Sequence, residues 1–110
     1  MGRRQRGAVE AKFRLWVTPA AWAEMKALLG HVRHRVKRAV DALADNPRPS
    51  PSTSLEFPEF EGDLRRLRIE NWRIIYAVSD ADRTVDVLGV RKRPPYQYQD
   101  LQDLIARLLP

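Results

Sequence analysis

Four stretches of the chain alternate hydrophobic and polar positions or are rich in strand-forming residues, which predicts four β-strands. They are residues 12–17, 63–70, 72–79 and 84–91. In the second stretch, Leu67 and Ile69 lie on one face, and the arginines on either side of Leu67 lie on the other. The third stretch is apolar on both faces except at Arg73, a pattern typical of a central strand. Between these two stretches, Glu70 and Asn71 predict a two-residue turn.

Apolar residues at helical spacing predict three helices. They cover residues 19–29, 32–45 and 99–109. Thr18 and Pro19 suit an N-cap and a first helical position, and Gly30 suits the break between the first two helices. Proline and serine between residues 46 and 54 predict a loop.

The order of these elements predicts an α+β fold. An N-terminal strand precedes an αα-hairpin that packs on one face of a mostly antiparallel four-stranded sheet, and a short C-terminal helix follows. Trp16, Trp22 and Trp72 are expected in the core. A chain of 110 residues has room for one modest core, so residues 12–110 are expected to form a single domain. Residues 1–11 are polar, basic and without period, which predicts a disordered arm.

Charge adds the first hint of function. Lysine and arginine number 20 against 14 acidic residues, which gives a net charge of +6 and a pI of about 10.3. A basic surface attracts phosphate backbones or an acidic protein partner, and solubility alone is the alternative explanation. Cysteine is absent, which excludes thiolate metal sites and fits a cytoplasmic protein. No apolar run is long enough for a membrane span, and no metal or cofactor site is expected.

Three segments, taken in order and spacing, resemble the RelE/ParE superfamily of toxin–antitoxin toxins. They are residues 32–43 (VRHRVKRAVDAL) with the following NPRP, residues 64–76 (LRRLRIENWRIIY), and residues 87–93 (VLGVRKR) followed by Tyr96 and Tyr98. The second segment carries a basic strand, a tight turn, an aromatic–arginine pair and an apolar-apolar-tyrosine ending. The likeness extends over about residues 12–105.

The resemblance implies a function as well as a fold. RelE-like ribonucleases cut messenger RNA in the ribosomal decoding site, by attack of a ribose 2′-hydroxyl on the neighbouring phosphate. The resemblance matches Arg66 to a basic strand position, Arg73 and Arg93 to arginines, and Tyr96 or Tyr98 to a terminal tyrosine. It also implies a cognate antitoxin. ParE members of the superfamily poison DNA gyrase on the same fold without a nuclease site.

Strand alternation supports a phosphate site independently. It places Arg66 and Arg68 on one side of the sheet, where Arg73 can join them if the hairpin keeps its register. The guanidinium group of arginine binds phosphate through two parallel hydrogen bonds. The alternative explanation is a solvent-exposed arginine face that binds nothing. We expect RNA binding by four strand arginines, which are Arg65, Arg66, Arg68 and Arg91.

RNA cleavage also needs a base, an acid and charge stabilisation. Arginine is effectively never deprotonated, and positions where RelE ribonucleases carry lysine hold Leu64 and Arg66 here. The expected catalytic residues are Arg73, Arg93, Lys92, Tyr96 and Tyr98. The tyrosines could instead pack on the last helix, and His31 and His34 are expected to be exposed and non-catalytic on the hairpin.

Three functions stay open on this sequence. The first is a ribosome-dependent mRNA endoribonuclease that inhibits translation. The second is a gyrase inhibitor of the ParE type, favoured by the missing lysines. The third is a catalytically inactive relative that acts as a binding module. The expected partners are a cognate antitoxin and either mRNA on the ribosome or DNA gyrase, with no membrane.

Overall fold

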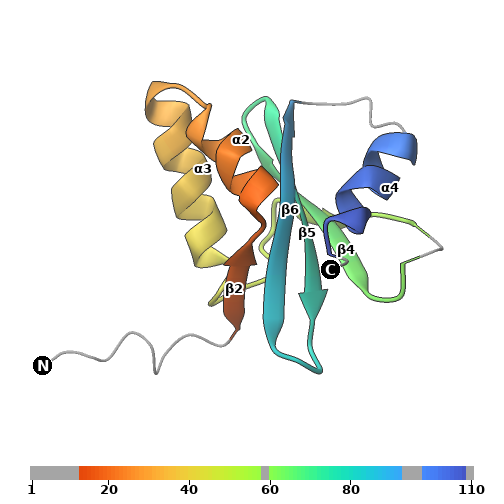
Figure 1. Ribbon diagram of the computed structural model, residues 1–110. Coiled ribbons are helices and arrows are strands. Elements are labelled where there is room, and N and C mark those ends of the chain that lie inside the picture. Colours follow the sequence, from red (N-terminus) through yellow and green to blue (C-terminus); the bar gives the residue numbers. More distant parts are fainter. Residues whose placement is uncertain (1–12, 58–59, 93–97, 109–110) are drawn as a thin grey trace, which may run out of the picture.

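The computed structural model describes residues 13–57, 60–92 and 98–108 (Figure 1). The expected disordered arm lies outside these residues. Within them, five strands and three helices follow in the order β2 (Arg14–Val17), α2 (Pro19–Lys26), α3 (Gly30–Ala42), β3 (Ser52–Ser54), β4 (Asp63–Ile69), β5 (Trp72–Ser79), β6 (Thr84–Lys92) and α4 (Tyr98–Ala106). No helix in the described part of the chain is long and apolar enough to cross a membrane.

The sheet has the strand order β2-β6-β5-β4-β3. The β2–β6 pair is parallel and the other three pairs are antiparallel. Figure 1 shows α2 and α3 on one face of this sheet and α4 on the other. The predicted α+β fold and its element order are therefore confirmed.

Two hydrophobic cores share the central strand β5. The larger core lies between the sheet and the α2–α3 hairpin, and Val36, Ile74 and Val87 are fully buried in it. The smaller core lies under α4, where Leu104 packs with Ile75 and Leu88. β5 is buried along almost its whole length because it contributes to both cores.

Local signals explain where several elements begin and turn. The Thr18 side chain accepts a hydrogen bond from the Ala21 N–H at 3.1 Å, as an N-cap does. Gly30 has a φ of +55° at the junction of the two helices, a conformation that glycine adopts without strain. Glu70 reaches a φ of +54° in the predicted two-residue turn between β4 and β5.

One strand and two side chains differ from expectation. β3 lies within the predicted loop, pairs with β4 as a three-residue edge strand, and makes the sheet five-stranded. Its serines and threonine carry no apolar alternation, so only the pairing with β4 reveals it. The prediction that Trp16 and Trp22 are in the core was wrong, since these side chains are 49% and 40% exposed. Trp72 is partly buried against the larger core, as expected.

A buried hydrogen bond ties the loop after α3 to the centre of the sheet. The Tyr76 hydroxyl donates to the backbone carbonyl of Pro47 at 2.7 Å, and the Tyr76 side chain is fully buried. On the outside of the same loop, Arg48 bridges Asp63 and Asp80 with contacts of 2.8 Å to each. These contacts fix the loop that leads into β3.

Candidate functional site

The register of the central strands gathers four arginines on the face of the sheet away from the α2–α3 hairpin. Arg68 of β4 pairs with Arg73 of β5, which pairs with Arg91 of β6. Arg66 lies two residues before Arg68 on the same face. We call these residues (Arg66, Arg68, Arg73 and Arg91) the arginine face. Of the predicted site residues, the structure brings these four together.

Three arginines in cross-strand register are unfavourable for stability alone, because like charges opposite each other on a sheet repel. Such a row therefore needs negative charge close by. It can come from the protein's own carboxylates or from a bound anion such as phosphate.

Arg73 is the most enclosed member of the row. Its side chain is only 9% exposed. One Nη atom donates to the backbone carbonyls of Glu70 at 3.4 Å and Trp72 at 3.1 Å. Its Nε atom is buried and has no hydrogen-bond partner among the described residues. A buried donor without an acceptor is costly, which favours a shift of the Arg73 side chain that brings this N–H to an anion.

The outer arginines of the face differ in their surroundings. Arg66 donates from Nε to the Thr53 hydroxyl of the edge strand at 2.9 Å. Arg68 is exposed to solvent. The Arg68 side chain can therefore reach a ligand that lies across β4, whereas Arg66 is held beside the edge strand.

Arg91 is neutralised by two carboxylates that the sequence did not suggest. Its Nη atom lies 2.9 Å from Glu24 of α2, and its Nε atom lies 3.1 Å from Asp100 of α4. Arg107, directly after α4, also reaches Glu24 at 3.1 Å and donates to the Leu88 carbonyl at 2.6 Å. We call Glu24, Arg91, Asp100 and Arg107 the ionic cluster. It fixes α4 beside the arginine face.

The electrostatics of the ionic cluster follow from its partial burial. Burial by itself would raise the pKa of Glu24. Hydrogen bonds from Arg107, the Val90 N–H and Arg91, together with the charge of Arg91, outweigh burial and hold the pKa of Glu24 below its ordinary value. Burial of Arg91 likewise opposes its charge, and the two carboxylates overcome that effect and raise the pKa of Arg91.

Two predicted site residues do not join the arginine face. Arg65 lies on the hairpin side of β4, where it pairs across the strand with Tyr76 and donates to the Ser52 hydroxyl at 3.1 Å. Lys92 pairs with Trp72 on that same side, with its Nζ atom 6.0 Å from the indole centroid. Both corrections follow from strand alternation, because each residue is one position away from an arginine of the face.

The remaining predictions are tested only in part. Arg93 and Tyr96 lie outside the described residues, and for Tyr98 only the backbone is described, as the first residue of α4. His31 and His34 are exposed on the hairpin, as expected. Among the described residues, no lysine or histidine lies on the arginine face, and no group of acidic or histidine side chains is arranged to hold a metal.

The sequence signals that could have found the ionic cluster are weak. Glu24 and Arg91 are 67 positions apart, and neither belongs to a motif. Glu24 is the single acidic residue of α2, and this is the one sequence signal that marks it as a partner for a basic residue. The fold brings Arg91 to Glu24 because the end of β6 that extends past β2 lies beside α2.

Comparisons with known proteins agree with this geometry. The family model described as "ParE toxin of type II toxin-antitoxin system, parDE" matches residues 15–94. No curated protein sequence matches the chain. Among solved structures, the archaeal RelE of a RelE–RelB complex from Pyrococcus horikoshii is similar with a TM-score of 0.67 and 23% identity, over 77% of this chain and 99% of that one.

Two bacterial structures give the same result. The RelBE2 toxin–antitoxin complex from Mycobacterium tuberculosis matches with a TM-score of 0.62 and 22% identity, over 74% of this chain and 99% of its own. The isolated E. coli RelE toxin matches with a TM-score of 0.60 and 20% identity, over 88% and 99%. At these identities the likeness shows the fold. Since the family model spans most of the chain, this protein belongs to the ParE toxin family of type II toxin–antitoxin systems, and with its RelE-like fold it is a toxin of the RelE/ParE superfamily.

Proposed function

We propose that this toxin is a ribosome-dependent mRNA endoribonuclease that acts in the cytoplasm and holds its substrate on the arginine face. The observation that carries the proposal is the buried Nε donor of Arg73, which has no partner among the described residues and belongs to a row of guanidinium groups. A shift of the Arg73 side chain would expose this donor, and a phosphate oxygen would then satisfy it and relieve the repulsion within the row.

The proposed reaction assigns separate roles to the residues. Arg73 and Arg93 stabilise the charge that develops on the phosphate during attack by the ribose 2′-hydroxyl. Arg66 and Arg68 bind the flanking backbone. Proton transfer falls to Tyr96 or Tyr98, because Lys92 lies on the other side of the sheet and a tyrosine needs a lowered pKa to act as a base.

The test is to express the chain under tight control and map RNA ends. We expect new ends within translated messages. Loss of one charge-assisted phosphate contact costs about 1.5–3 kcal/mol, so Arg68→Ala should slow cleavage by about ten- to a hundredfold. Because Arg68 is exposed, its loss leaves the core intact. Arg14→Ala, which removes an equally exposed arginine from β2, is the matched control.

A second function is gyrase inhibition, favoured by two observations. The family model is that of ParE toxins, and the arginine face holds no lysine or histidine among the described residues. Intact RNA together with an induced DNA-damage response, and inhibition of supercoiling by purified toxin, would replace the first proposal with this one.

The proposed partner is a cognate antitoxin. The solved RelE relatives from P. horikoshii and M. tuberculosis are complexes with their antitoxins. We propose that an acidic or amphipathic antitoxin segment covers the arginine face of this chain and contacts α4, which is short and rests on a small apolar stripe and the ionic cluster.

A further inference from the structure

The α2–α3 hairpin carries a second cationic surface, on the side of the sheet opposite the arginine face. Most exposed positions of α3 are basic, namely Arg33, Arg35, Lys37 and Arg38 with His31 and His34. Two of these cations form exposed ion pairs: Lys37 with Asp41, the single carboxylate of α3, at 2.8 Å, and Arg35 with Glu70 at 2.9 Å. Exposed pairs of this kind are weak and can be exchanged for another anion. None of these side chains belongs to the arginine face, so the proposed mRNA site does not explain why α3 is basic.

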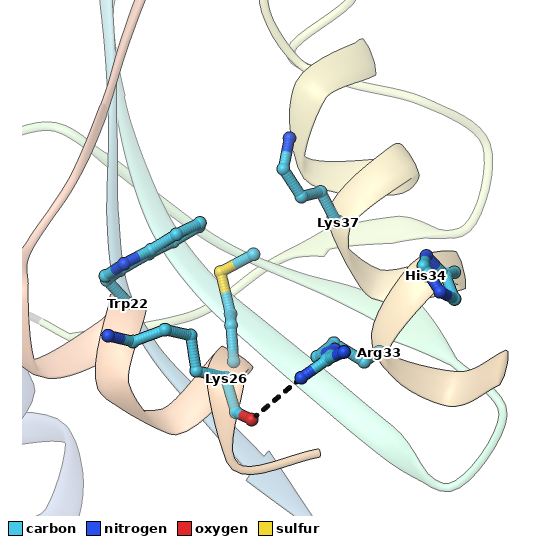
Figure 2. Close-up of a pocket in the computed structure, with 6 residues that line it drawn as sticks. Trp22, Lys26, Arg33, His34 and Lys37 are labelled. Atoms are coloured by element: carbon cyan, nitrogen blue, oxygen red, sulfur yellow. Dashed lines mark hydrogen bonds between the residues drawn. The ribbon is translucent and has the colours of Figure 1, made fainter. Parts of the chain in front are cut away.

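An apolar pocket opens within this surface, between the two helices. Its volume is about 220 Å³, and it is lined by Trp22, Met25, Lys26, Arg33, His34 and Lys37. In Figure 2, Trp22 and Lys26 come from α2, and Arg33, His34 and Lys37 come from α3. Met25 is buried at the bottom, whereas Trp22 keeps 40% of its surface exposed. Arg33 donates an exposed hydrogen bond of 3.5 Å to the Lys26 carbonyl, from α3 to α2.

The pocket combines an aromatic wall with a rim of hydrogen-bond donors. The Lys26 ammonium lies 5.9 Å from the centroid of the Trp22 ring. Arg33 adds a guanidinium group to the rim, and Lys37 adds a second ammonium group. No carboxylate lines the pocket. A ligand that suits such a site is flat and apolar on its faces, rich in acceptors at its edge, and joined to negative charge. A nucleobase on a phosphate chain has all three properties.

We propose that the α2–α3 hairpin is an RNA-binding surface, with phosphates along α3 and an unpaired base in the pocket beside Trp22. Arg33 and Lys37 are four residues apart, so they follow one another along the helix at a rise of about 6 Å and can bind successive parts of a backbone. Unpaired bases are the usual recognition feature of folded RNA, whereas a DNA duplex keeps its bases stacked.

The spread of charge around α3 favours RNA over an acidic peptide. Arg35 and Arg38 lie on the other flank of the helix, where they line a separate depression with Ala39 and Ile69. A helical peptide seated in the α2–α3 pocket would meet only the pocket flank. A folded polyanion that lies across α3 meets both flanks, and its phosphates replace the exposed carboxylates of Glu70 and Asp41 at Arg35 and Lys37. The inference goes beyond the proposed function, because it requires no cleavage chemistry.

The test uses the full chain with Arg66→Ala and Arg68→Ala, which weakens the arginine face. Fluorescence anisotropy with a labelled RNA stem-loop that carries an unpaired purine measures binding at several salt concentrations. Adding Arg33→Ala and Lys37→Ala should weaken binding roughly tenfold at physiological salt. It should also reduce the slope of log K against log salt by about 1.4, since each lost phosphate contact removes about 0.7.

Two controls separate the hairpin from net charge. Arg14→Ala with Arg83→Ala removes the same charge from exposed positions near the far end of the sheet and should leave the affinity nearly unchanged. Trp22→Leu keeps the pocket apolar but removes the stacking surface, so it should weaken binding of the purine stem-loop about fivefold. It should have no effect on a fully paired RNA.

Equal losses for the hairpin pair and the control pair would overturn the proposal, since binding would then follow net charge alone. Failure of Trp22→Leu to distinguish the two RNAs would overturn the placement of a base in the pocket. The proposal would also fail if RNA binding ignored the hairpin variants while an acidic amphipathic peptide bound in a Trp22-dependent manner. None of these outcomes depends on whether the wild-type chain cleaves RNA.

Discussion

At the scale of single residues, Tyr76, the tyrosine at the end of residues 64–76, stabilises the fold. Tyr76 is fully buried, and its hydroxyl donates a hydrogen bond to the carbonyl of the buried Pro47. Tyr76→Phe leaves that carbonyl without a donor, which costs about 1–3 kcal/mol. We expect a lower melting temperature with unchanged secondary structure, measured by circular dichroism. Ser50→Ala, which removes an exposed hydroxyl from the loop that leads into β3, should change the unfolding free energy by less than about 0.5 kcal/mol. Equal effects of the two variants would contradict this assignment.

Residue identity alone predicted part of the candidate site. Alternation placed Arg66 and Arg68 on one face, and the structure agrees. The same rule, applied strictly, would have excluded Arg65. This residue lies two positions before Leu67 and therefore on the same face of the strand as Leu67. Trp22 was assigned to the core because helical spacing fixes a face, but spacing does not determine how far a neighbouring helix covers that face.

At the scale of elements, α4 depends on the ionic cluster. The pKa of Glu24 is lowered in the folded chain, so its ionised form favours folding at pH values above its ordinary pKa of 4.5. That contribution is lost as the pH falls from 4.5 through the lower folded-state value. We therefore expect α4 to loosen in this acidic range before the sheet unfolds, with faster amide hydrogen exchange at Leu101 and Leu104.

Glu24→Gln should reproduce this effect at neutral pH. Exchange in α4 should rise while exchange in β5 stays slow, because the larger core is untouched. Asp41→Asn is the matched control, since it breaks an exposed surface pair of little energetic value. If α4 stays as protected in Glu24→Gln as in the control, the apolar contacts of the helix suffice to hold it.

Elements with strong local periodicity were the predictable ones. Helices 19–29 and 32–45 and the strands at 63–79 were found within a few residues of their observed bounds, because their signals lie within each segment. β3 and the ionic cluster were not found. Both exist only through contacts with distant segments: Ser52 pairs with Leu67, and Glu24 meets Arg91.

At the scale of the whole molecule, positive charge covers both sides of a small body. The Cα radius of gyration is 14.0 Å, comparable with two Debye lengths at physiological salt. An acidic antitoxin therefore experiences the field of the arginine face and the hairpin together, which speeds encounter. We expect co-purification with the product of the neighbouring reading frame and an association rate that falls steeply with salt. A partner that binds at a salt-independent rate, or no partner at all, would contradict this expectation.

The parallel pairing of β2 with β6 also governs how the chain is made. The Thr18 hydroxyl, directly after β2, donates to the Leu88 carbonyl across 70 residues of sequence, and β6 is the one neighbour of β2 among the described strands. At synthesis rates of about 5–20 residues per second, β2 waits roughly 4–14 s for its partner. The sheet consequently closes after most of the chain has been translated, and β6 is also the last strand to contribute to the arginine face. A nascent copy therefore lacks a complete arginine face for most of the time it spends on the ribosome that makes it.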